Sequence, residues 1–187
     1  MHYRLSGGWD RTLKLWDVAG GKAIRTFQGH LSAVWSVAFS PDGRSVLSGG
    51  WDNTLKLWDA TSDRAIRTFE QHSRGVSSVA FAPDGRTMLS GSHDNTLKLW
   101  DIASDLEIRT FQGHSAMIND IVFSPDGGTV LSGSRDNTLK LWNVANGEAI
   151  RTLEGHSRGV TSVAFSPDGQ RAASGDWDGV MILWGAE

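Results

Sequence analysis

Serine, histidine and aspartate recur together along this 187-residue sequence, and hydrolases combine these three residue types for nucleophilic catalysis. A tryptophan accompanies each set. The four sets are His30, Ser48, Asp52 and Trp58; His72, Ser90, Asp94 and Trp100; His114, Ser132, Asp136 and Trp142; and His156, Ser174, Asp178 and Trp184. Four near-copies of one catalytic site are improbable in a chain this short. We therefore predict no catalytic residue and no enzymatic activity.

A structural role accounts better for the four sets. A buried indole N–H, imidazole and carboxylate each need a hydrogen-bond partner, and these groups can supply one another. Each such bond contributes only about 1 kcal/mol, but a buried group left unpaired costs about 1–3 kcal/mol. We expect each set to form a buried hydrogen-bond network.

Metal binding is a second chemistry that histidine and aspartate suggest. Histidines 42 residues apart lie in successive repeats, about 10 Å or more from one another, whereas a metal ion holds its ligands at about 2 Å. The stretch 176–179 (DWDG) resembles part of a calcium loop but lacks the remaining ligands and the closing glutamate. The chain has no cysteine. We predict neither a metal site nor a cofactor.

The four sets belong to a repeat of 42 residues. The tryptophan of an LW pair recurs at Trp16, Trp58, Trp100, Trp142 and Trp184, and a Pro-Asp-Gly turn recurs at 41–43, 83–85, 125–127 and 167–169. Several markers thus share one period without an insertion. Such a period is typical of an architecture built from stacked units.

Each unit has the pattern of short strands joined by tight turns, as the 22 glycines and 9 tryptophans also suggest. Residues 34–39 (VWSVAF) suit a strand that is buried on both faces. In the following SPDG, proline presets φ, aspartate bonds locally and glycine takes the left-handed conformation. Residues 44–50 and 53–59 then pair across a second turn, and the more polar 64–70 suits an outer strand facing water.

One unit runs GHLSAVWSVAFSPDGRSVLSGGWDNTLKLWD over residues 29–59, and its GH opening and WD closing resemble the WD-repeat β-propeller family. The close similarity of the units resembles some bacterial members. The resemblance implies an all-β fold of four-stranded antiparallel blades around a channel, and a hydrogen-bond network in each blade. We expect one domain over 1–187, with units at 1–28 (partial), 29–70, 71–112, 113–154 and 155–187 (partial).

The strand count predicts an incomplete ring of about four and a half blades. The chain supplies three strands over 3–28, three sets of four, and three strands up to Trp184. Since open sheet edges are an aggregation liability, we expect a homodimer of half-rings in which Lys22–Gln28 supplies the missing outer strand of the partner. Eight blades result, or nine or ten if residues 3–17 build partial blades. Alternatively, the chain is a piece of a longer propeller.

Charge and hydropathy exclude two classes of partner. The formal net charge is −3, without a basic patch, so we expect no nucleic-acid binding. No apolar stretch approaches the roughly 20 residues of a membrane span, and the first ten residues lack the apolar core of a secretion signal. We expect a cytoplasmic protein that does not bind membranes.

Partner binding is expected at positions that vary within the nearly constant repeat. By resemblance, the recognition surface carries the residues just before the turn aspartate and those three and five positions after the GH histidine. The candidates are Trp9, Trp35, Trp51, His93, Met117, Asn119, Arg135 and Trp177. Exposed Trp, Arg and Met are favoured in binding hot spots. We predict a non-catalytic scaffold that binds a protein or peptide. The alternatives are a lectin-like propeller whose indoles stack on sugars, tryptophans that pack only between adjacent loops, and a fragment of a multidomain sensor.

Overall fold

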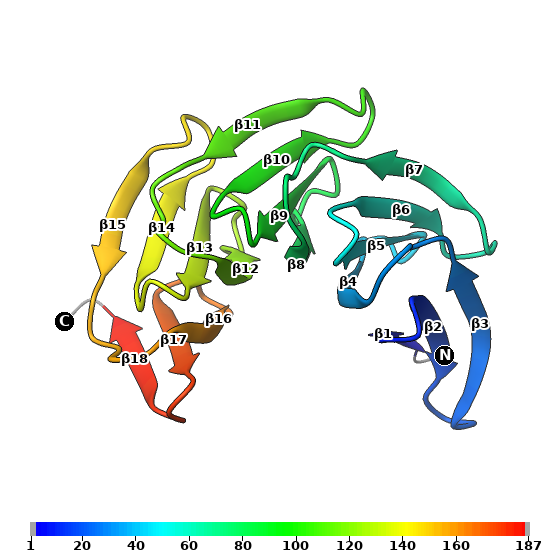
Figure 1. Cartoon of the computed structure of the whole chain (residues 1–187), viewed down its shortest axis with the longest axis horizontal. Helices are drawn as coiled ribbons and strands as arrows, with labels where there is room; N and C mark the ends of the chain where they lie inside the picture. The colour runs from blue at the N-terminus through cyan, green and yellow to red at the C-terminus, as the bar shows by residue number, and fades with distance from the viewer. Residues whose placement is uncertain (1–2, 186–187) are drawn as a thin grey trace.

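Five antiparallel β-sheets follow one another along an open arc (Figure 1). The structure is a computed structural model and describes residues 3–185, all of whose regular elements are strands. The first and last repeat units reach residues 1 and 187 in the sequence, and their residues 1–2 and 186–187 lie outside the described part. The predicted all-β fold with four-stranded antiparallel units is confirmed.

The strands of each sheet are consecutive in sequence. The first sheet contains β1 (Tyr3–Gly7), β2 (Thr12–Asp17) and β3 (Lys22–Gln28). The second contains β4 (Val34–Phe39), β5 (Ser45–Gly50), β6 (Leu55–Asp59) and β7 (Ala65–Phe69). The third contains β8 (Val76–Phe81), β9 (Thr87–Ser92), β10 (Leu97–Asp101) and β11 (Glu107–Phe111). The fourth contains β12 (Ile118–Phe123), β13 (Thr129–Ser134), β14 (Leu139–Asn143) and β15 (Ala149–Leu153). The fifth contains β16 (Val160–Phe165), β17 (Arg171–Asp176) and β18 (Met181–Gly185).

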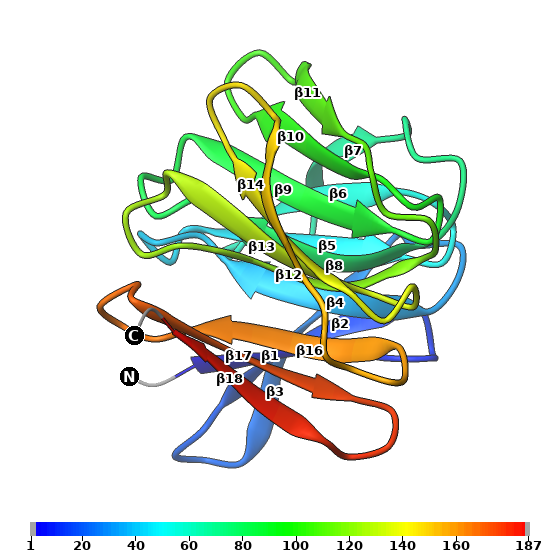
Figure 2. The same ribbon diagram turned by 90° about the vertical axis from the view of Figure 1, so that its left-hand side faces the viewer.

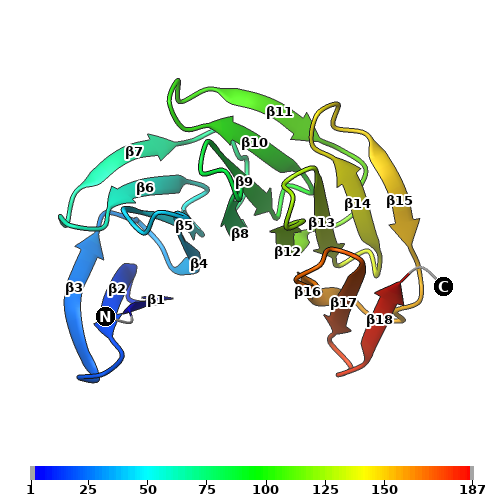
Figure 3. The same cartoon turned by 180° about the vertical axis from the view of Figure 1, so that it is seen from behind.

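The sheets are arranged radially. Strands β4, β8, β12 and β16 line the inner side of the arc, and β3, β7, β11 and β15 form its outer side, as Figure 1 and the reverse view in Figure 3 show. In the side view of Figure 2, β16, β17 and β18 of the fifth sheet lie below β12, β13 and β14 of the fourth. Within residues 3–185, the first sheet has no inner strand beside β1, and the fifth has no outer strand beside β18. The strand distribution along the chain is the predicted one.

The Pro-Asp-Gly turns have the predicted chemistry. In the turn after β4, Gly43 adopts φ +70° and its N–H donates to the carbonyl oxygen of Ser40 at 2.9 Å. The Asp42 carboxylate accepts from the Ser40 hydroxyl at 2.6 Å and from the Arg44 N–H at 3.0 Å. Since a side chain at φ near +70° is strained, glycine is the natural residue at this position.

The core lies between successive sheets. We call the side of a sheet that faces the next sheet its back, and the opposite side its front. Leu55, Leu57 and Phe69 on the back of the second sheet pack against Val76 and Trp100 on the front of the third. Equivalent clusters join every neighbouring pair of sheets in the described chain. Each sheet therefore depends on its neighbours to bury its apolar side chains.

The prediction that residues 34–39 form a strand buried on both faces is wrong. Val34 of β4 is buried, but Trp35 is 45% exposed and the remaining residues of the strand are half-buried. The reason is its position, because β4 lines the open centre of the arc (Figure 1). The most deeply buried strands are instead β5, β9 and β13, which lie one position further out.

Candidate partner-binding surface

A chain of hydrogen bonds crosses each of the four units that begin with one of the histidines spaced 42 residues apart. In the unit of residues 71–112, the Trp100 indole N–H donates to the Ser90 hydroxyl oxygen at 2.9 Å. That oxygen lies 2.7 Å from His72 Nε2, and His72 Nδ1 lies 2.8 Å from an oxygen of Asp94. Since the Ser90 oxygen already accepts from Trp100, its proton is free to donate to His72 Nε2. His72 then carries its own proton on Nδ1 and donates it to Asp94.

This geometry repeats in the other three units, with the corresponding contacts between 2.6 and 3.0 Å. Ser48, Ser90 and Ser132 are fully buried, as are Trp58 and Trp100. A serine enclosed in this way has no open side from which a substrate could approach. The arrangement is suited to holding together the loop before the inner strand, the second strand and the third strand of each sheet.

The carboxylates of these networks are charged, and most of their oxygen atoms already accept hydrogen bonds. Burial alone raises the pKa of Asp94, but hydrogen bonds from His72 and Thr96 hold it far below its usual value. The pKa of His30 is also lowered, because burial lowers it more than the nearby Asp52 raises it. His30 therefore stays neutral at pH 7, as the bonding pattern requires.

The fifth unit uses a different aspartate from the predicted one. Its imidazole, His156 Nδ1, lies 2.8 Å from Asp176 and not within bonding distance of Asp178. Asp176 also accepts the backbone N–H groups of Asp178 and Val180, both at 3.0 Å. Asp178 is exposed and lies 3.4 Å from Arg158. The repeat register points to Asp178, but an aspartate two positions earlier, at the end of β17, is buried and reaches the imidazole first.

The candidate partner-binding residues occupy one side of the arc, which we call the loop face. It consists of the loops between sheets and the loops between the second and third strands of each sheet. The backbone N–H of Trp51 donates to Ala33, that of His93 to Gly75, and that of Arg135 to Met117, each at 2.9 Å. These bonds hold the two kinds of loop against each other. The residue before each turn aspartate therefore occupies an equivalent position on the loop face in successive sheets.

Four side chains of the loop face form an aromatic cluster: Trp9, Trp35, Trp51 and His93. The ring centroids of Trp35 and Trp51 are 5.0 Å apart, and Trp9 lies 6.1 Å from Trp35. The His93 ring meets Trp51 edge to face at 5.0 Å. Trp9 is 84% exposed and Trp51 46% exposed, so packing within the chain covers only part of these indoles. Packing thus accounts for part of this surface, and the exposed part of the indoles stays a candidate for partner binding.

A groove of about 690 Å³ runs from this cluster across the inner strands, and we call it the channel groove. Trp35 and His93 line one end of it, and Arg135 and Trp177 line the other. The Arg135 guanidinium lies 5.9 Å from the centre of the Trp177 ring, within the range of a cation–π contact. Trp177 is 63% exposed. A volume of this size is typical of a site for a small ligand or for a few side chains of a peptide.

Two predicted binding residues are partly occupied by contacts within the chain. The Asn119 side chain lines the channel groove, but its amide donates to the Val160 carbonyl oxygen of the next sheet at 2.6 Å. Ser77 and Thr161, at the equivalent positions, also donate to backbone carbonyls. Met117 is half-buried. The position five residues after the GH histidine thus joins neighbouring strands wherever it is polar.

Asp120 is a groove residue that the pattern of the sequence did not single out. Its carboxylate accepts from the Ser78 hydroxyl at 2.9 Å, the Ser162 hydroxyl at 3.2 Å and the Val163 N–H at 2.9 Å. It thereby ties three inner strands together at the floor of the channel groove. The sequence marks this residue only by a difference between repeats, because the equivalent residue in the other units is serine and here it is aspartate.

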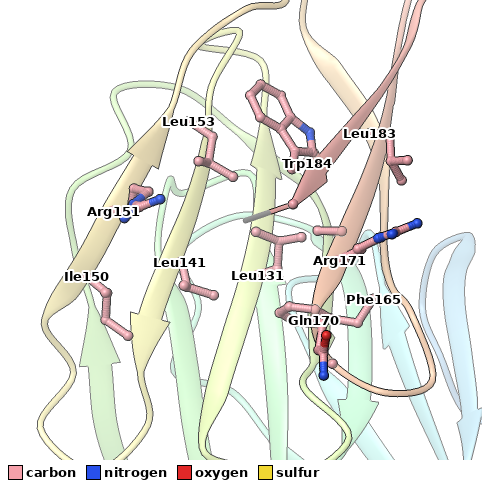
Figure 4. A pocket seen from close by; sticks show the side chains of 13 residues that line it. Leu131, Leu141, Ile150, Arg151, Leu153, Phe165, Gln170, Arg171, Leu183 and Trp184 are labelled. Carbon is pink, nitrogen blue, oxygen red and sulfur yellow. The ribbon is translucent and has the colours of Figure 1, made fainter. Parts of the chain in front are cut away.

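A second cavity, of about 510 Å³, lies away from the loop face between the fourth and fifth sheets (Figure 4). Its walls are mostly the apolar side chains that pack these sheets together, including Leu141, Leu153 and Trp184. It opens beside β18, where the fifth sheet has no outer strand. This cavity belongs to the incomplete end of the arc, and Arg151 and Arg171 also line it.

Two further features of residues 3–185 concern metal binding and membrane insertion. No group of three His, Cys, Asp or Glu side chains there is arranged to hold a metal ion. That part of the chain also has no helix of the length and apolarity that crossing a membrane requires.

Comparison with known proteins identifies the repeat. The family model described as "WD domain, G-beta repeat" matches residues 2–17, 21–59, 63–101, 106–143 and 147–185. The chain is 51% identical over 37 residues to the human peroxisomal targeting signal 2 receptor, which is 20% of this chain and 12% of the receptor. It is 53% identical over 36 residues to a probable E3 ubiquitin ligase complex SCF subunit, scon-2, of Neurospora crassa, which is 19% of this chain and 6% of that subunit.

A third relative is the human dynein assembly factor with WD repeat domains 1, which is 44% identical over 36 residues, or 19% of this chain and 9% of the factor. Each of these matches spans less than one full repeat of 42 residues and at most 12% of the relative's length. The relatives therefore share the repeat unit with this chain.

Proposed function

Because the chain belongs to the WD domain, G-beta repeat family, we propose that it is a non-catalytic scaffold that binds a protein or peptide partner through the loop face. One observation carries the proposal: four indoles on this face are substantially exposed, and two of them line the channel groove. Burying an indole in an interface contributes far more than burying a small side chain, and tryptophan is enriched in hot spots for this reason. The names of the similar proteins, a receptor and an assembly factor among them, are consistent with a binding role.

A peptide selection tests this function. We expect peptides selected from a displayed random library to bind the chain, and the double substitution Trp51→Ala and Trp177→Ala to weaken them at least about 30-fold, which corresponds to about 2 kcal/mol. The matched control is Leu106→Ala, which removes an exposed apolar side chain from the outer side of the arc. Titration calorimetry gives the affinities and circular dichroism the fold.

Two results would count against a peptide-binding scaffold. One is a double variant that loses its fold, which would assign both indoles to packing. The other is a failure of the selection together with tryptophan-dependent signals on a glycan array, which would favour the sugar-binding alternative.

The two ends of the arc support a second proposal, that the chain assembles with a copy of itself. In the third sheet, Leu97 and Leu99 of β10 are 0% and 4% exposed because the fourth sheet covers them. At the equivalent positions of β18, Met181 is 77% exposed and Leu183 is 68% exposed. Apolar side chains exposed in this way favour association.

A second copy can close the ring in a way that uses both incomplete sheets. We propose that β16, β17 and β18 of one copy take the place of β1 and β2 beside β3 of the other. They would pair with that β3 as their outer strand and supply the inner strand that the first sheet lacks. Two such junctions, related by a two-fold axis, close a ring of eight four-stranded sheets.

Solution measurements test this assembly. We expect sedimentation analysis at micromolar concentration to give twice the mass of one chain, and amide hydrogen exchange to be faster in the displaced β1 and β2 than in β5 and β6. A monomer that melts sharply at this concentration would contradict it.

A further inference from the structure

Two exposed guanidinium groups lie at or near the channel groove, whose lining also includes the carboxylates of Asp120 and Asp176. Arg135 lines the groove and Arg74 lies near the aromatic cluster, and both are exposed. Neither forms a salt bridge among the described residues. Burial lowers the pKa of His93, and the positive charges of Arg135 and Arg74 lower it further. Both guanidinium groups thus lack a carboxylate of the chain as an ion-pair partner.

The carboxylates that line the groove already accept several hydrogen bonds from the chain. Asp120 accepts three hydrogen bonds from β8 and β16, as well as one from the backbone of Ile121. Asp176 accepts from His156 and from two backbone N–H groups. A cationic ligand would therefore find few free acceptor positions on these groups. The Trp177 ring, which attracts cations, already has the Arg135 guanidinium beside it.

We propose that the partner of the loop face is a peptide segment in which acidic side chains flank an apolar or aromatic one. The apolar side chain would pack against Trp35 and Trp51, at one end of the groove. An acidic side chain would pair with Arg135 at the other end, where the guanidinium is held beside Trp177 and pairs well with a carboxylate. This inference rests on the proposed function and specifies its partner.

Three labelled peptides of nine residues test the charge preference. Each has a central Phe-containing segment, and they differ only in carrying Glu, Gln or Lys at the three flanking positions. We expect fluorescence anisotropy to show the Glu peptide binding about tenfold more tightly than the Gln peptide, and the Lys peptide binding most weakly. Raising the NaCl concentration from about 0.05 M to 0.5 M should narrow the difference, because salt screens exposed charges.

A pair of matched variants locates the preference. Arg135→Glu should abolish the advantage of the Glu peptide. Arg44→Glu makes the same change of charge in a Pro-Asp-Gly turn, at the end of the strands away from the loop face, and should leave the advantage unchanged. Equal binding of all three peptides, or an Arg135→Glu variant that keeps the preference, overturns the acidic-partner inference.

The same experiment separates this inference from the proposed function. If the three peptides bind equally and Trp51→Ala abolishes the binding, the loop face binds peptides but does not select acidic ones. If none of the three binds, both the function and the inference are contradicted.

Discussion

Replacing Ser90 by alanine should lower the free energy of unfolding by about 2–4 kcal/mol. The Ser90 hydroxyl is the centre of its network, because it lies 2.9 Å from the Trp100 indole nitrogen and 2.7 Å from His72 Nε2. All three side chains are buried, so water cannot take its place. Alanine would leave a buried indole N–H without an acceptor and a buried imidazole nitrogen without a donor. Urea denaturation gives the change directly, provided the slope of the transition stays constant.

The first sheet offers a natural control for this substitution. Ser6 occupies the equivalent position and accepts from the Trp16 indole at 2.9 Å, but its unit has no histidine at the position equivalent to His72, and its side chain is exposed. Water can satisfy Trp16 when the hydroxyl is removed. We therefore expect Ser6→Ala to change the stability by no more than about 0.5 kcal/mol. Equal losses for the two variants would show that the buried network contributes nothing of its own.

The sequence predicted these networks well because they repeat. Within each unit, the histidine, serine and tryptophan keep the same spacing, and strands of constant length keep them in contact. The fifth network was misassigned for the same reason. Counting by the period leads to Asp178, whereas the bond to His156 depends on which carboxylate the end of β17 places beside the imidazole. A repeat fixes the backbone, and a local change of side chain can still alter the partner.

Burial along the inner side of the arc was harder to predict. The composition of residues 34–39 favours a strand with both faces covered, but the cover on one side depends on how many sheets the arc contains and whether it closes. The same limit affects the groove. Variation between repeats identified Trp35 and Arg135 as surface candidates, yet it did not show that Asn119 bonds to Val160 or that Asp120 joins three strands. Those contacts join residues of different units, so the pattern within one unit does not predict them.

Replacing Gly91 by alanine should destabilise the chain by about 1–3 kcal/mol, because the contact between β9 and β12 has no room for a methyl group. A Cβ at Gly91 would lie 2.8 Å from a methyl carbon of Ile118 and 2.9 Å from one of Ile121. Both are on the inner strand of the next sheet, so the sheets would have to separate or the side chains shift. Urea denaturation of the variant measures the cost.

Gly175 is the equivalent residue on β17, and its substitution tests the assembly. A Cβ there would have no atom within 4 Å, because no sheet of the described residues packs against this side of β17. Gly175→Ala should therefore leave the stability of a monomer within about 0.5 kcal/mol of its original value. In the proposed eight-sheet ring, Val34 of the second copy would contact Gly175 as it contacts Gly7 in one chain, where an added Cβ would lie 2.7 Å from its methyl carbon.

The methyl group should therefore act on association and not on the monomer. Each dimer has two such junctions, so we expect Gly175→Ala to raise the dimer dissociation constant at least tenfold in sedimentation experiments, with an unchanged circular dichroism spectrum. A dimer that is insensitive to Gly175→Ala would contradict closure through β3, since a ring that keeps both three-stranded sheets brings no inner strand against β17. Such a ring would have ten sheets, and the exposed apolar side chains of β18 would then meet the front of β2.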